Sequence, residues 1–466
     1  MVFDDLSPGY AAIVGVTEPL VALLVIAFLA RGIPRVLFIA QLVYWSLSYI
    51  ARPILLLQVR PVPAFGDSIA DTRVANTGYD YNISHILPTV TWSLWIYVAM
   101  VFVFVLWQRT RPTEVMLPIQ SRNTIATLGA TWAITSLVRL YAYFAGQPGR
   151  AGEITSAHPY IQFFTDMGSL AAIGLILYFH SSRLPVLVLV FTFAAGGELL
   201  WGIATESKTP FLGAVLAAVI RMSAGRVSRG RVAAIVGASI GAIALFSSLQ
   251  SVKEDANTAI LTAGADRSYP LAVQPFLSIL RRFDLFASAT DVYFLDGRPY
   301  IGSGDVLSRM FLNLVPQQLG IQKIQSGTEW ANMVRGSSVD MSGVQVSLAE
   351  GHFAEGYAVA GYLGVAAESL FVIAMIVLVG KSLASRFLPF IMLGLVFISL
   401  PPLFERGALG ITETLGKGLQ AVAAVSALGV VMWFFSRRSD EPPVLDFPDA
   451  DSSSAQLINM EREDLR

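Results

Sequence analysis

The sequence predicts an all-α polytopic membrane protein with about eleven transmembrane helices and one large extracytoplasmic loop containing amphipathic helices. Hydrophobic residues make up 54% of the 466 residues and charged residues only 14%, and the mean hydropathy is +0.61. Soluble domains have about 25% charged residues. Apolar segments of about 20 residues, the length of a membrane-spanning helix, recur along the chain. The alternating pattern of an outer-membrane barrel is absent.

The predicted spans fall into two groups. An N-terminal bundle, residues 1–250, holds eight of them, and residues 357–435 hold three. The segments lie at 9–30, 36–57, 86–107, 123–144, 161–180, 184–203, 209–224, 232–250, 357–380, 387–403 and 417–435. The segment at 209–224 is short, and the one at 387–403 contains Pro401 and Pro402, so a re-entrant course is open for both. The first segment lacks the features of a cleaved signal peptide, so we expect it to remain as a span.

Orientation follows from the short connections, because Lys and Arg are retained on the cytoplasmic side of a membrane. One alternate set of connections holds fourteen such residues: Arg31, Arg35, Arg109, Arg111, Arg122, Arg183, Arg221, Arg226, Arg229, Arg231, Lys381, Arg386, Arg437 and Arg438. The other set, without the long loop, holds six: Arg60, Arg73, Arg150, Lys208, Arg406 and Lys417. This asymmetry predicts that the N-terminus and residues 251–356 lie outside and that the C-terminus lies in the cytoplasm.

Composition also bears on partners and cofactors. The net charge is −1 and no basic patch favours nucleic acid. The chain has no cysteine, which excludes disulfides and thiolate metal ligands. Its four histidines, at positions 85, 158, 180 and 352, show no metal-ligand spacing, so we predict neither a metal site nor a cofactor. Residues 436–466, rich in Ser, Asp, Glu and Pro, are predicted to be a disordered cytoplasmic tail.

The loop at 251–356 has the pattern of folded structure. Apolar residues recur at helical spacing between Leu271 and Leu295, which predicts an amphipathic helix carrying Arg281, Arg282 and Asp284. A second helix is predicted from Asp305, as an acidic N-cap, to Leu319, with a kink or an end near Pro316. Such helices can lie on the membrane surface and roof a cavity in the bundle.

Several ionisable residues lie within apolar segments or at their ends. They are Arg52, Arg139, Asp166, Glu198, Glu206, Lys208 and Glu368. Because a charge at the bilayer centre costs several kcal/mol, such residues are functional or paired inside the bundle. For Arg139 the sequence leaves open a ligand contact and a structural ion pair, and for Arg52, Asp166 and Glu198 it favours a structural role. For Lys208 it leaves open a phosphate contact and a side chain that snorkels to the interface.

Four motifs follow one another in the second half of the chain: Glu206–Leu212, Arg281–Phe286, Leu312–Pro316 and Glu350–Gly364. Their order resembles that of the O-antigen polymerase, or oligosaccharide repeat-unit polymerase (Wzy), family. The closest likeness is the acidic-aromatic-glycine stretch from Ala354 to Gly364. Two positions depart from the family pattern: Lys208 stands where Arg is commoner, and Gln317 where a basic residue is frequent. These departures leave open which cations bind the lipid pyrophosphate.

The resemblance implies a membrane glycosyltransferase that polymerises lipid-linked oligosaccharide repeat units. It implies transfer of a glycan from an undecaprenyl-pyrophosphate donor to a sugar hydroxyl of a lipid-linked acceptor. The reaction would take place on the outer face of the bacterial inner membrane, for O-antigen, capsule or exopolysaccharide synthesis. Besides this substrate and membrane lipids, the implied partners are a flippase and a chain-length regulator.

Such a reaction needs a base for the acceptor hydroxyl and cations for the departing pyrophosphate. Glu350, His352 and Glu355 are the candidate bases. Glu355 is favoured because it belongs to the acidic-aromatic-glycine element, and in a helix it would share a face with His352. Both glutamates could instead be acids near the start of a helix, where the positive end of the helix dipole stabilises a negative side chain. The candidate substrate-binding residues are Arg281, Arg282, Arg335, Lys208 and Arg139.

Two other functions remain open. A ligase that transfers a finished glycan to a different acceptor would need the same donor and the same kind of loop. A flippase or transporter of lipid-linked oligosaccharide would place ionisable residues along a central path. The concentration of Arg and Glu in one loop favours the polymerase.

Overall fold

The structure is a computed structural model, and every regular element in its described part is a helix. It describes residues 6–63, 69–111, 116–146, 159–205, 209–224, 237, 241, 268–295, 300–316, 319, 326–335, 349–399 and 402–439. Within these ranges, eight helices are long and apolar enough to cross a membrane. The predicted class, a polytopic all-α membrane protein, is confirmed at this level.

The membrane-length helices match most of the predicted spans. They are α1 (Pro8–Leu29), the run of α2 (Gly32–Ser46), η1 (Leu47–Ala51) and α3 (Arg52–Val59), α5 (Tyr79–Arg109), α6 (Arg122–Phe144), α7 (Pro159–Tyr178), α8 (Leu184–Ala204), α16 (His352–Leu383) and α19 (Ala408–Ser439). Two shorter apolar helices, α9 (Thr209–Ser223) and α17 (Leu388–Ser399), occupy two more predicted spans. The predicted span at 232–250 lies outside the described residues except for positions 237 and 241, and so does the predicted tail beyond 439.

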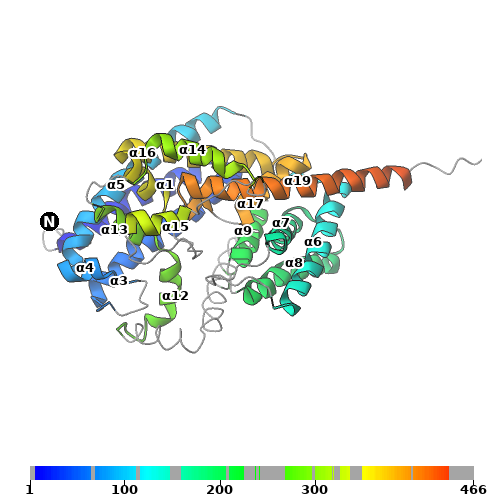
Figure 1. Cartoon of the computed structure of the whole chain (residues 1–466). Coiled ribbons are helices and arrows are strands. Elements are labelled where there is room, and N and C mark those ends of the chain that lie inside the picture. Colours follow the sequence, from blue (N-terminus) through cyan, green and yellow to red (C-terminus); the bar gives the residue numbers. More distant parts are fainter. Residues whose placement is uncertain are drawn as a thin grey trace, which may run out of the picture.

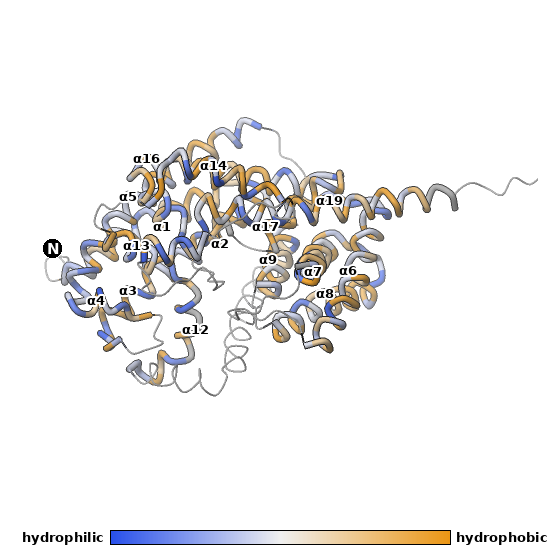
Figure 2. The backbone as a smooth tube through the Cα atoms, viewed as in Figure 1, coloured by the Kyte–Doolittle hydropathy of each residue, from blue (hydrophilic) through white to orange (hydrophobic). Residues whose placement is uncertain are grey.

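The helices form two groups that α17 and α19 join. The first group is α1, α2, α5 and α16, and the second is α6, α7, α8 and α9 (Figure 1). Hydrophobic residues cover the outward faces as well as the core, as Figure 2 shows along the helices. Val25 and Phe28 of α1, for example, and Leu137 of α6 are each more than half exposed. An apolar exterior of this kind is what a lipid-facing helix requires.

Contacts between helix ends show which connections share an end of the bundle. At one end, called the loop end because the helices of the long loop lie there, Gly351 N donates to Glu405 O at 2.9 Å. At the opposite end, Arg31 N donates to the Gln108 side chain at 2.8 Å. Gln120 Nε2, which donates to Ser385 O, and the Tyr178 hydroxyl, which donates to Leu383 O, join further described connections predicted to be cytoplasmic. At the loop end, Arg73 donates to Asp291 of the long loop. Which end faces the cytoplasm stays a prediction.

The first predicted loop helix is divided in two. In place of one helix from Leu271 to Leu295, the structure has α12 (Gln274–Arg282) and α13 (Leu285–Tyr293). The break falls at Phe283 and Asp284. Asp284 forms an ion pair with the buried Arg52, and the Phe283 ring packs edge-on against a tyrosine ring of α2 at 4.6 Å. These contacts with the bundle hold the chain at the break, which periodicity alone did not predict.

The second predicted loop helix is shifted toward the N-terminus. Helix α14 runs over Ser303–Leu314, and its N-cap is Gly302, so Asp305 lies in the first turn and is not the cap. The helix ends before Pro316, as predicted, because Val315 is extended, the conformation that a following proline favours. It packs along α19, where a side chain at Gly416 would collide with the Asn313 carbonyl. Beyond it lie α15 (Ser326–Trp330) and η3 (Ala331–Arg335).

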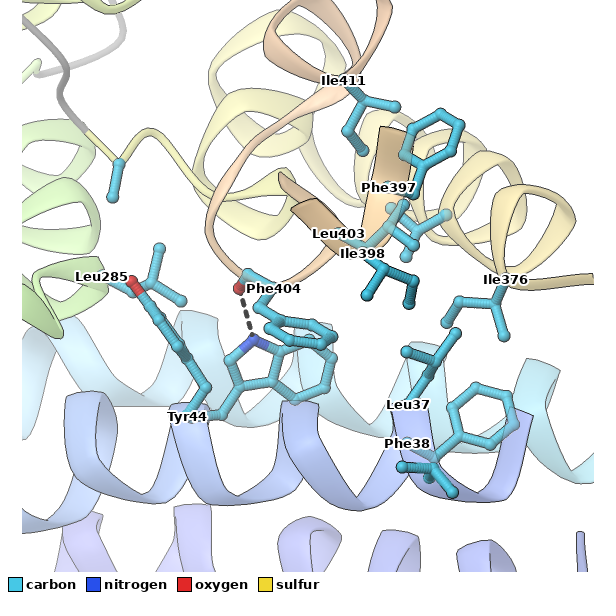
Figure 3. Close-up of a cluster of buried hydrophobic side chains, with 14 of the residues drawn as sticks. Leu37, Phe38, Tyr44, Leu285, Ile376, Phe397, Ile398, Leu403, Phe404 and Ile411 are labelled. Carbon is cyan, nitrogen blue, oxygen red and sulfur yellow. Dashed lines mark hydrogen bonds between the residues drawn. The ribbon is translucent and has the colours of Figure 1, made fainter. Parts of the chain in front are cut away.

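The core at the loop end fixes the connection between α17 and α19. Leu403 and Phe404 of the short helix α18 (Pro402–Glu405) face Tyr44 and its neighbours on α2, and Leu285 of α13 lies beside them (Figure 3). The Trp45 indole N–H donates to Phe404 O at 3.1 Å. This packing positions Glu405 and the residues that follow it.

Candidate active site

Helix α16 bends sharply near its start. Ala360 and Gly361 have non-helical backbone angles, and Gly361 has φ +59°, which favours glycine. A Cβ atom on Gly356 would lie 2.7 Å from the carbonyl carbon of Gly364. Residues eight apart in a straight helix would be separated by about 12 Å. The first eight residues, His352–Val359, therefore form a short helix that folds back on the long span.

The bend brings together two glutamates, Glu355 and Glu368. A straight helix would hold them about 20 Å apart, yet two consecutive N–H groups of α19 reach both carboxyl groups. Both are buried, and both accept hydrogen bonds from the first turn of α19. Leu409 N donates to Glu355 Oε1 at 3.1 Å, and Ala408 N donates to Glu368 Oε2 at 3.2 Å. The acid pair thus satisfies helix N–H groups that have no partner within the helix.

Arg406 and Glu350 complete the acidic part of the site. Glu350 is fully buried, and its Oε1 lies 3.7 Å from Arg406 Nη1, an ion pair beyond hydrogen-bond distance. Burial raises the pKa of the Glu350 carboxyl, and the Arg406 charge partly offsets this. Arg406 also donates to Ser326 Oγ at 3.2 Å. Sequence analysis did not select Arg406 as a site residue, although its place just before the last span is a signal that could have identified it.

Tyr300 faces this acidic cluster from the loop. Its side chain is 3% exposed and packs in a small apolar cluster with Ala354, Leu409 and Trp330. Its hydroxyl has no hydrogen-bond partner within the described part of the chain. Burial raises the pKa of Tyr300, and the charge of Glu355 adds to this. Sequence analysis missed this residue, and no motif marks it.

His352, the second candidate base, lies among aromatic rings. Its ring centroid is 5.5 Å from that of Trp45, 5.6 Å from that of Tyr97 and 4.1 Å from that of Phe353. It is 1% exposed, and its Nε2 has no hydrogen-bond partner among the residues that the structure describes. No hydrogen bond between His352 and Glu355 is found there, although the two residues share the same short helix.

Arginines and aspartates form a second cluster at the loop end. Asp291 of α13 is fully buried and accepts hydrogen bonds from Arg73 at 2.5 Å, from Arg335 Nε at 3.0 Å and from the Trp330 indole at 3.1 Å. Arg73 also pairs with Asp71 at 2.7 Å. Burial by itself lowers the pKa of Arg335, but Asp291 outweighs it and the net pKa is raised. Arg335, a predicted substrate contact, is therefore already paired with a carboxylate.

Trp330 joins the two clusters. Its indole donates to Asp291, and its ring packs edge-on against Tyr300 with the centroids 5.2 Å apart. The structure thus brings Glu350, Glu355 and Arg335 into one region at the loop end. Arg281 lies on α12 and is partly buried, whereas the side chain of Arg282 and the whole of Lys208 fall outside the described residues.

Arg139 lies elsewhere, inside the second helix group. It projects from α6 and pairs with Glu198 of α8 at 2.6 Å. It also donates to Ser169 Oγ at 2.7 Å and to Thr165 O at 2.9 Å, both on α7. Of the two interpretations left open by the sequence, the ion pair is the one that the structure contains.

An apolar groove of about 330 Å³ adjoins the short helix of α16. It lies between η1, α5, α13 and α16, and its lining includes Phe353 and Ala354, which immediately precede Glu355. Three tyrosines, Tyr49, Tyr293 and Tyr357, place aromatic surface around it. The acidic cluster is therefore next to a groove that suits an apolar ligand with polar groups at one end.

Comparison with protein families, with curated proteins and with solved structures finds no match for this chain. The resemblance to O-antigen polymerases therefore rests on the sequence motifs. Within the described ranges, no three His, Asp or Glu side chains are placed to hold a metal ion.

Proposed function

We propose that this protein is a membrane glycosyltransferase that polymerises lipid-linked oligosaccharide repeat units. The observation that carries the proposal is the buried pair Glu355 and Glu368, held at the bend of α16 beside Arg406 and an apolar groove. We place the loop end on the outer face of a bacterial inner membrane, with the N-terminus outside and the C-terminus cytoplasmic. A flippase would deliver the substrate, and a chain-length regulator would act on the product.

The acid pair supports base catalysis. Two buried carboxyl groups this close are not both ionised, so they share one proton and keep one carboxylate to accept another. In the proposed step, the acceptor hydroxyl oxygen attacks the anomeric carbon of the donor glycan. The bond from that carbon to the pyrophosphate oxygen breaks, the pyrophosphate leaves with the electron pair, and the hydroxyl proton passes to Glu355. Glu350 and His352 remain alternative bases.

The leaving pyrophosphate needs fixed cations. Arg406 is the best placed, since it already neighbours the buried Glu350. Arg335 and Arg73 would contact the phosphates only by exchanging part of their pairing with Asp291. Arg281, Arg282 and Lys208 stay as further candidates from the sequence. The adjoining groove supports binding of the apolar isoprenoid chain.

A ligase would use the same cluster with a different acceptor. A transporter of the same lipid-linked substrate is favoured by charges inside the bundle. The buried Arg139–Glu198 pair between α6 and α8 is such a charge pair. The experiment below separates all three.

The test uses purified protein in liposomes with an undecaprenyl-pyrophosphate-linked oligosaccharide. We expect the wild-type protein to produce a ladder of longer lipid-linked glycans. Glu355→Gln keeps the size and hydrogen bonding of the side chain but removes the base, so it should slow extension about 10²- to 10⁴-fold without lowering thermal stability. Glu18→Gln, at an exposed glutamate of α1, is the matched control and should retain full activity.

Two results would contradict the proposed polymerase, and a third would reassign its base. Transfer of one glycan to an unrelated acceptor, without a ladder, would indicate a ligase. Movement of unmodified substrate across the bilayer would indicate a transporter. A full ladder from Glu355→Gln, with none from His352→Ala, would leave the polymerase in place but assign the base to His352.

A further inference from the structure

A cavity of about 420 Å³ lies at the end of the bundle opposite the loop end. It is formed by the ends of α7 and α9 and by the first half of α8. Leu117, Leu177, Phe191 and Met222 provide apolar walls, and Arg221 provides the positive charge.

Arg221 is held in a fixed position. Its Nη1 donates to Ile176 O at 2.8 Å and to Leu177 O at 3.1 Å, and its Nη2 donates to Phe179 O at 2.8 Å. Its guanidinium lies over the Phe191 ring, 4.6 Å from the centroid. These bonds use three of its five N–H groups. No ion pair with a carboxylate is found for Arg221 in the described part of the chain.

The charged residues that the structure describes around this end have one sign. Arg and Lys occur throughout the connections at this end, namely Arg31, Arg35, Arg109, Arg111, Arg122, Arg183, Arg221, Lys381 and Arg386. The described residues of these connections, at 30–35, 108–111, 116–122, 179–183, 221–224 and 381–388, include no Asp or Glu. A ligand that fits this end is therefore anionic. Because the cavity walls are apolar, the ligand also carries hydrocarbon.

We infer that this cavity binds an anionic phospholipid, with the headgroup phosphate at Arg221 and an acyl chain along Leu117, Phe191 and Met222. Basic pockets between transmembrane helices recognise such headgroups. The two N–H groups of Arg221 that remain after its three carbonyl bonds are available to phosphate oxygens, and Arg is suited to this contact. The inference does not depend on the proposed glycosyltransferase activity.

The experiment measures lipid binding by native mass spectrometry of the detergent-purified full chain. Phosphatidylglycerol, phosphatidylcholine and inorganic phosphate are the probes. We expect phosphatidylglycerol to bind about tenfold more tightly than phosphatidylcholine, a difference of about 1.4 kcal/mol. Arg221→Gln should abolish the preference.

Arg221 also caps the end of α7, so its loss can impair folding. Leu117→Trp therefore serves as the second variant, because it fills the cavity and leaves every Arg221 hydrogen bond intact. It should weaken phosphatidylglycerol binding about tenfold. Arg386→Gln, at an exposed arginine of the same end, is the matched control and should change nothing.

Equal binding of the two lipids would overturn the inference, and so would unchanged binding in Leu117→Trp. Displacement of phosphatidylglycerol by inorganic phosphate, equally in the wild type and in Arg386→Gln, would assign the cavity to a soluble phosphate. An equal loss in Leu117→Trp and Arg386→Gln would show general surface attraction and no defined site.

Discussion

Two buried charged clusters differ in how completely their polar atoms are satisfied. In the Arg139–Glu198 cluster, both carboxylate oxygens accept hydrogen bonds, at 2.6 Å from Arg139 and at 2.5 Å from Ser169. Both terminal nitrogens of Arg139 donate, and its guanidinium lies 5.3 Å from the Trp201 ring centroid. Only its Nε has no hydrogen-bond partner among the described residues. This cluster ties three helices together with its own atoms.

The cluster at the bend of α16 is less complete. The Tyr300 hydroxyl and His352 Nε2 are buried without a hydrogen-bond partner among the described residues. Arg406 Nη1 lies 3.7 Å from Glu350 Oε1, which is too far for a hydrogen bond. An unsatisfied buried polar group costs about 1–3 kcal/mol, so a site that keeps several is one where a ligand, water or a transferred proton completes the bonds. This difference supports a structural role for the first cluster and the chemical role proposed for the second.

The largest effect on stability is expected from breaking the Arg139–Glu198 cluster, the more complete of the two. Glu198→Ala leaves the Arg139 charge buried without its partner, which should cost about 3–5 kcal/mol of unfolding free energy. Thermal unfolding in detergent measures the loss. The double variant Arg139→Leu with Glu198→Leu should recover much of it, because replacing both charges by apolar groups removes the buried, unpaired charge. An unchanged unfolding temperature in Glu198→Ala would remove the distinction between the two clusters.

A smaller, pH-dependent effect is expected at Glu350. Burial raises the pKa of this carboxyl above its ordinary 4.5, so ionising it costs more in the folded than in the unfolded protein. Its contribution to stability is therefore present at low pH and is lost as the pH rises through the raised value. Glu350→Gln should lose less thermal stability than the wild type as the pH rises above 4.5.

The exposed-site variant Glu18→Gln is the control for this measurement and should follow the wild-type curve. Identical pH profiles for Glu350→Gln and the wild type would mean that the Arg406 charge fully compensates for the burial of Glu350.

The spans could be predicted from the sequence because each depends on local composition. Helix α5, for example, contains the continuous apolar segment predicted at 86–107, although the helix itself begins seven residues earlier, at Tyr79. The division between α12 and α13 could not be predicted, because Arg52, the ion-pair partner of Asp284, is 232 residues away in the chain. Tertiary contacts decide that break.

The candidate site was predicted only in part, for the same reason. Glu350 and Glu355 stand in a recognisable motif, and the structure places both in the buried acidic cluster. The bend at Ala360 and Gly361 falls inside an unbroken apolar stretch, so nothing local indicates that Glu368 returns to Glu355. Arg406 is 51 positions from Glu355, and only the packing of α18 on α2 brings it to the site.

The smallest stability effect, and the most discriminating, is expected from Tyr300→Phe. It deletes a buried hydroxyl that has no partner in the described residues, so stability should stay within about 0.5 kcal/mol or rise. If the hydroxyl completes its bonds with substrate, glycan extension should fall about tenfold or more. Tyr97→Phe is the matched control, since the Tyr97 hydroxyl donates to Gln41 at 2.6 Å. Loss of this hydrogen bond should cost about 1–2 kcal/mol and leave glycan extension unchanged.

The two variants are compared by thermal unfolding under the same conditions. Equal destabilisation by Tyr300→Phe and Tyr97→Phe would show that the Tyr300 hydroxyl is hydrogen-bonded in the folded protein. The two clusters would then not differ in the way described above.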